Sequence, residues 1–77
     1  MSQMIKLRNI FREIFDDEMM SISEETQRND IEDWDSVAHV KIVLAVEEAF
    51  FVRLTTDEVS IVKSVGDLIA AINRHSR

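Results

Sequence analysis

The chain contains a single glycine and no proline among its 77 residues. Glycine and proline are the residues that most often interrupt helices and shape the tight turns between strands. Their near absence therefore favours helices over a sheet of short strands. At this length the chain is near the lower limit for folding on a single core, and it has no cysteine for a disulfide or a cysteine-based zinc site. We therefore expect one all-α domain over residues 1–77.

Apolar residues at helical spacing predict three main helices and one short helix. The main helices are expected over residues 4–15, 36–51 and 64–75, and the short one over residues 55–61. The stretch 16–35 has no sustained period and is rich in polar residues, so we expect a long loop there, with at most a helical turn. A loop of this length in a small domain is often functional.

The second predicted helix divides its apolar residues between two faces. We expect a buried face of Val40, Val43, Val46 and Phe50, and an exposed face that carries Val37 and Leu44. His39 is expected to face solvent. Several further side chains are expected to cap or support the helices: Asp35, Thr55, Glu58 and Ser64 at helix starts, His75 in the last turn, and Trp34 packing the loop onto the core.

The net charge of −6 is large for so short a chain. It disfavours nucleic acid or an anionic membrane surface as a partner, and it favours proteins with basic docking surfaces. Ten acidic residues lie between Glu13 and Asp35, where Arg28 is the one basic residue. No apolar run approaches the roughly 20 residues of a membrane span, and the first residues do not follow a signal-peptide pattern. We expect a cytoplasmic monomer.

Ser36 is the candidate for chemistry, because it lies where the acidic loop ends and a helix is predicted to begin. Asp35, Ser36 and His39 contain the residue types of a catalytic triad, but their spacing on a helix start offers no oxyanion hole. The acidic residues nearby lack the glycine that a calcium-binding EF-hand loop requires at its turn. We therefore predict no catalytic residue and no dedicated metal site; the charge of these residues alone would give at most a weak, screened association with calcium.

The Asp-Ser-Val motif at residues 35–37, followed by Val-x-x-Val-x-x-Val-Glu-Glu-Ala-Phe, resembles the acyl carrier protein family. The resemblance extends over the whole chain in helix order, acidity and length. It implies that a phosphopantetheinyl transferase attaches 4′-phosphopantetheine from coenzyme A to Ser36, and that acyl groups are carried as thioesters. It also implies docking of acyl-loading and acyl-transfer enzymes, through their basic surfaces, on the second helix. The implied docking residues are Asp35, Val37, Lys41, Leu44, Glu47 and Glu48.

The chain departs from the fatty-acid carriers of this family at several positions. It lacks the leucine and glycine that usually precede Asp-Ser, and Lys41 and Phe51 stand where relatives often have an acid and a glycine. The pattern of Trp34 and His39 around Ser36 looks more like stand-alone carriers of polyketide, lipid-modification or surface-polysaccharide pathways. Two alternatives stay open: an aminoacyl or peptidyl carrier, and an acidic helical adaptor without a prosthetic group.

Overall fold

The computed structural model describes residues 2–75, which form four α-helices and one short 3₁₀-helix. This confirms the predicted all-α bundle and its long loop between the first two helices. The observed helix ends differ from the predicted ones by at most two residues. The elements are α1 (Ser2–Ile14), the 3₁₀-helix η1 (Arg28–Asp30), α2 (Ser36–Phe50), α3 (Thr56–Ile61) and α4 (Val65–His75).

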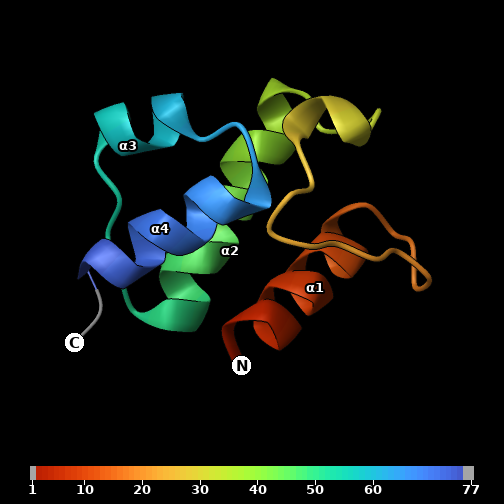
Figure 1. Ribbon diagram of the computed structural model, residues 1–77, viewed down its shortest axis with the longest axis horizontal. Helices are drawn as coiled ribbons and strands as arrows, with labels where there is room; N and C mark the ends of the chain where they lie inside the picture. Colours follow the sequence, from red (N-terminus) through yellow and green to blue (C-terminus); the bar gives the residue numbers. More distant parts are fainter. Residues whose placement is uncertain (1, 76–77) are drawn as a thin grey trace.

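The three longer helices enclose the core, and α3 lies at the side of the molecule away from α1 (Figure 1). The loop after α1 swings outward and returns through η1 to the start of α2. The core is formed by apolar side chains of α1, α2 and α4, with additions from the loops. Its largest fully buried members are Leu7, Phe11, Ile42, Val46, Val62, Val65, Leu68 and Ile72.

The buried face of α2 differs from the predicted one. Val40 is 54% exposed, so its assignment to the core was wrong, while Ala38 and Ile42 are buried. An α-helix advances about 100° per residue, so residues spaced three apart drift around the helix by about 60° at each step. Valines spaced three apart therefore do not all face the core, and Val40 points to solvent. The observed face alternates steps of three and four and also includes Val43 and Val46.

Backbone pairing ties the loop between α1 and α2 to the segment between α3 and α4. Gln27 and Ser64 form an isolated antiparallel bridge, and Arg28 N–H donates to Lys63 O at 2.8 Å. The chain's single glycine, Gly66, permits the closest approach. A Cβ atom there would lie 2.9 Å from Glu24 O, the carbonyl to which Gly66 N–H donates. Any side chain at this position would push the two segments apart.

Glu58 links the start of α3 to the end of α4. It completes the predicted capping box, since Thr55 N–H donates to its Oε1 at 2.9 Å while Thr55 Oγ1 accepts from Glu58 N–H. His75 Nε2 lies 2.7 Å from the same oxygen, and Arg74 Nη1 lies 3.3 Å from Oε2. His75 was predicted only to favour the C-terminal end of α4, and it also connects that end to α3 through Glu58. The hydrogen bond from the Thr55 backbone, followed by the one from His75, lowers the pKa of the Glu58 carboxyl.

The lowered pKa of Glu58 predicts a specific dependence of stability on pH. A carboxyl whose pKa is lower in the folded than in the unfolded chain stabilises the fold above its unfolded pKa. That contribution is lost as the pH falls through the folded pKa. We expect Glu58→Gln to destabilise the protein at pH 7 and to converge with the wild type between about pH 5 and pH 3. Urea denaturation followed by circular dichroism at several pH values measures this difference.

Asp57→Asn is the matched control, because Asp57 lies in the same first turn of α3 and is exposed. Its effect on the free energy of unfolding should be small and should change little over the same pH range. A Glu58→Gln effect of equal size at pH 7 and pH 3.5 would mean that the Glu58 contacts do not depend on its charge.

Candidate functional site

Ser36 is the first residue of α2 and is exposed. The preceding Asp35 is the N-cap that the sequence predicts, with an extended backbone and with Oδ1 accepting from Ala38 N–H at 2.9 Å. Within residues 2–75 the N–H groups of Ser36 and Val37 make no hydrogen bond. The Ser36 hydroxyl therefore lies in solvent beside two free amide donors at the positive end of the helix dipole.

An apolar stripe runs along the outer surface of α2 from the position after Ser36. Val37, Val40 and Leu44 are 64%, 54% and 59% exposed, and their spacing places them on one side of the helix. The predicted exposure of Val37 and Leu44 is confirmed, and Val40 lies on the same exposed face although it was predicted to be buried. Exposed apolar side chains on one face suit contact with another protein.

The two acidic residues near the end of α2 have different surroundings. Glu48 is exposed, as expected for a residue that meets a partner. Glu47 is half-buried, and its Oε2 accepts from Leu54 N–H at 2.9 Å. Its carboxylate thus holds the chain just after α2, where Phe51 adopts a left-handed backbone with φ of 56°. A substitution of Glu47 would therefore alter the fold as well as the surface charge.

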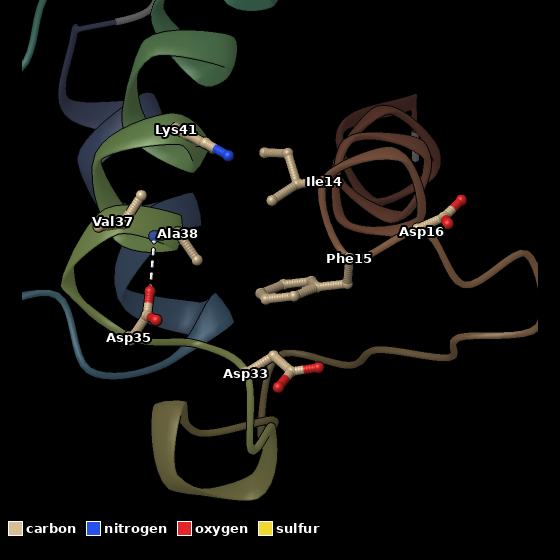
Figure 2. A pocket seen from close by; sticks show the side chains of 8 residues that line it. All are labelled: Ile14, Phe15, Asp16, Asp33, Asp35, Val37, Ala38 and Lys41. Carbon is tan, nitrogen blue, oxygen red and sulfur yellow. Dashed lines mark hydrogen bonds between the residues drawn. The ribbon is translucent and has the colours of Figure 1, made fainter.

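A groove of about 340 Å³ lies between the end of α1 and the start of α2. Figure 2 shows the side chains of Ile14, the last residue of α1, and of Phe15, which follows it, directed toward α2, with the Lys41 ammonium group directed toward Ile14. The full lining is Ile14, Phe15, Asp16, Asp33, Asp35, Val37, Ala38 and Lys41. The fold thus brings Asp35, Val37 and Lys41 together at one groove, whereas Leu44, Glu47 and Glu48 lie further along α2.

His39 is buried, so the expectation that it faces solvent was wrong. Trp34 Nε1–H donates to His39 Nδ1 at 3.0 Å, and His39 Nε2 lies 3.0 Å from Val59 O. Because the indole can only donate and the carbonyl can only accept, the ring is a neutral imidazole with its proton on Nε2. His39 therefore joins the loop before Ser36 to α3 and is unavailable as a base for the Ser36 hydroxyl.

Two further findings concern ligands and membranes. Within residues 2–75, no group of three or more histidine, aspartate or glutamate side chains is arranged to hold a metal ion. None of the helices in this range is long and apolar enough to cross a bilayer. The cytoplasmic location stays a prediction.

Comparisons with known proteins place this geometry in a family. No family model matches the chain. An acyl carrier protein from Lactobacillus acidophilus is 32% identical over 71 residues, which cover 91% of this chain and 88% of the relative. The chain belongs to the acyl carrier protein family. As a member of this family, the protein is a carrier and not an enzyme.

A solved structure of this family has the same fold. The solution structure of a holo acyl carrier protein from Geobacter metallireducens matches with a TM-score of 0.86 at 32% identity. The match covers 97% of this chain and 86% of that one. The arrangement of helices around Ser36 is therefore the arrangement of an acyl carrier protein, and the predicted family is confirmed.

Proposed function

We propose that Ser36 is the attachment site of 4′-phosphopantetheine and that the protein carries acyl groups on this arm. The observation that carries the proposal is the exposed hydroxyl at the first position of α2, next to an N-cap that is already satisfied by Asp35. An arm attached there projects into solvent without displacing any core side chain.

The residues around Ser36 suit the phosphate of such an arm. The N–H groups of Ser36 and Val37, which have no partner within residues 2–75, are donors for an anionic oxygen, and the helix N-terminus favours negative charge. Asp35 holds its carboxylate against Ala38 N–H, so part of its charge is already engaged within the helix start. When bound, the arm supplies the thiol that holds acyl groups as thioesters, which agrees with a chain that has no cysteine.

The attachment reaction assigns a simple role to Ser36. Its hydroxyl oxygen forms a new bond to the phosphorus that bears pantetheine in coenzyme A. The pyrophosphate bond breaks, and adenosine 3′,5′-bisphosphate leaves. Because His39 is already bonded to Trp34 and Val59, it cannot take the hydroxyl proton, and we expect the transferase to supply the base. This division of labour agrees with a carrier that performs no catalysis.

Incubation with coenzyme A and a broad-specificity phosphopantetheinyl transferase should increase the intact mass by one phosphopantetheine. Ser36→Ala should abolish this gain completely, because alanine has no nucleophilic oxygen. Ser60→Ala is the matched control, since Ser60 is also an exposed helical serine but lies inside α3. The absence of a mass gain in the wild type would favour the unmodified adaptor. A gain that survives Ser36→Ala would move the attachment to another residue.

We further propose that the carrier serves a specialised pathway rather than general fatty acid synthesis. Lys41 supports this, because it places a positive charge on α2 between the apolar residues Val37 and Leu44. A basic enzyme surface that meets an acidic carrier would be repelled locally at this point. Partners of this protein are therefore expected to have an acidic or apolar patch opposite Lys41.

Opposite charge changes on α2 should have opposite effects on transfer to this carrier. We expect Lys41→Glu to speed loading by enzymes of fatty acid synthesis, and Glu48→Lys to slow it, each by about two- to fivefold at low salt. Steady-state loading rates, measured over a range of salt concentrations, test this. Glu25→Lys, in the exposed loop, changes the net charge as Glu48→Lys does and controls for long-range effects. If Glu25→Lys and Glu48→Lys slow loading equally, local docking at α2 is contradicted.

A further inference from the structure

The fold brings the one basic residue of the acidic loop beside a second basic residue. Arg28 and Lys63 lie 35 positions apart in sequence, yet Arg28 N–H donates to Lys63 O at 2.8 Å. The Gln27–Ser64 bridge and the bond from Val65 N–H to Thr26 O, at 2.9 Å, hold the same two segments in register. The juxtaposition is therefore set by backbone pairing and does not depend on either side chain.

A cavity of about 410 Å³ lies at this junction, and its lining consists of Gln27, Arg28, Asn29 and Lys63. All four side chains carry hydrogen-bond donors, and none is an acid. Asp30 and Asp67 lie nearby, but their carboxylates accept from Gln27 N–H and Lys63 N–H, both at 2.9 Å. Within residues 2–75, neither Arg28 nor Lys63 forms an ion pair. The lining of the cavity therefore carries two cationic side chains and no carboxylate, in a protein of net charge −6.

We propose that this cavity, the Arg28–Lys63 pocket, binds the anionic end of the group carried on the arm. The ligand chemistry is a carboxylate or a phosphate, which the guanidinium and ammonium groups bind by charge-assisted hydrogen bonds. The cargo would then be an acyl group with a negatively charged terminus. This inference rests on the proposed attachment at Ser36.

The pocket lies close to the proposed attachment site. Arg28 Nε donates to Trp34 O at 3.4 Å, and Trp34 precedes Ser36 by two residues. Two residues span at most about 7 Å between Cα atoms. Ser36 is not part of the lining, so the phosphate bonded directly to its oxygen is a poorer candidate than the distal end of a flexible arm. A tethered group also has an effective concentration in the millimolar range, so a millimolar affinity suffices.

The first experiment tests the pocket without the arm. Unmodified protein at low ionic strength is titrated with succinate or inorganic phosphate and followed by ¹H–¹⁵N spectra. Succinamide serves as the neutral probe, and sodium chloride at matched ionic strength controls for screening.

We expect saturable shifts at Gln27, Arg28, Asn29 and Lys63 with either anion. Lys63→Gln should weaken binding by about fivefold or more. Lys63 has an exposed side chain, so this change should leave the fold intact.

Arg53→Gln is the matched control, because it removes one exposed positive charge outside the pocket. Arg53→Gln should leave the affinities for succinate and for phosphate unchanged. Three results would overturn anion binding at this pocket. The shifts could fail to saturate, they could appear equally with succinamide, or Arg53→Gln could weaken binding as much as Lys63→Gln does.

The second experiment tests the cargo. The protein is loaded from succinyl-coenzyme A or butyryl-coenzyme A by a broad-specificity transferase, and loading is verified by mass. We expect the succinyl form to shift the pocket amides relative to the butyryl form, and Lys63→Gln to remove this difference. If the succinyl and butyryl forms, both verified by mass, give identical pocket amide shifts, the inference is overturned while Ser36 stays the proposed attachment site. Pocket shifts already present with the bare arm would identify its own phosphate as the ligand and overturn the assignment to cargo. Failure to load would remove the proposed function and the cargo assignment together.

Discussion

Trp34→Ala should lower the free energy of unfolding by about 3–5 kcal/mol, the range for removal of a large buried aromatic side chain. Trp34 is buried and lies edge-on against Phe11, with ring centroids 5.2 Å apart. Its removal would leave a cavity between α1 and the loop that leads to Ser36, and it would leave His39 Nδ1 without a donor. Urea denaturation followed by circular dichroism measures the change, since the variant lacks tryptophan fluorescence.

A loss of this size is a large share of the stability of a small domain, so a second variant that stays folded is needed. Trp34→Phe provides the second measurement. It keeps an aromatic ring against Phe11 but removes the Nε1–H donor, and we expect a loss of about 1–3 kcal/mol. Phe51→Ala is the control, because Phe51 is an aromatic residue that is 92% exposed. A Trp34→Ala effect no larger than that of Phe51→Ala would show that Trp34 does not support the core.

The packing role of Trp34 could be predicted from sequence, but its polar partner was missed. The signal for His39 was present, because Ile42, Val43 and Val46 follow it at three, four and seven positions. This spacing places His39 on their buried face. The valines recur at steps of three, which points to a different face of the helix, and a histidine near a helix start is more often a surface residue. The prediction that His39 faces solvent followed its residue type and not its position on the helix. A histidine can be buried when both of its ring nitrogens form hydrogen bonds.

The proposed attachment site was predictable because its signals are local. An aspartate cap, a serine at the first helical position and an apolar helix after it occupy one short stretch, which the structure places as expected. The Arg28–Lys63 pocket has no such local signal. It depends on the pairing of two irregular segments and on the close contact at Gly66, and neither has a period that the sequence reveals.

The link between Trp34, His39 and α3 leads to the second large effect. His39→Phe should lower the free energy of unfolding by about 2–4 kcal/mol. The phenyl ring fills much of the space but leaves Trp34 Nε1–H unpaired in a buried site, at about 1–3 kcal/mol. It also removes one hydrogen bond from the half-buried Val59 O, at about 1 kcal/mol, while Val59 O keeps the bond from Val62 N–H at 3.4 Å. Val43→Ala, a truncation on the same face, measures the cost of lost packing without lost hydrogen bonds.

The double variant Trp34→Phe/His39→Phe separates the hydrogen bond from the packing. Both single changes break the same Nε1–H to Nδ1 bond, so their combined effect should be smaller than the sum by about 1 kcal/mol or more. Additive effects would mean that this bond contributes nothing to stability.

Hydrogen exchange locates the consequence of the His39 change within the fold. Because His39 Nε2–H donates to Val59 O, its loss should release α3 from α2 more than it affects α1. We expect the amides of α3 (Thr56–Ile61) to lose more protection in His39→Phe than those of α1, under conditions where both exchange by local opening. Uniform loss across all helices would instead make His39 a general core residue. A selective loss would make it the side chain that holds α3 beside the proposed attachment site.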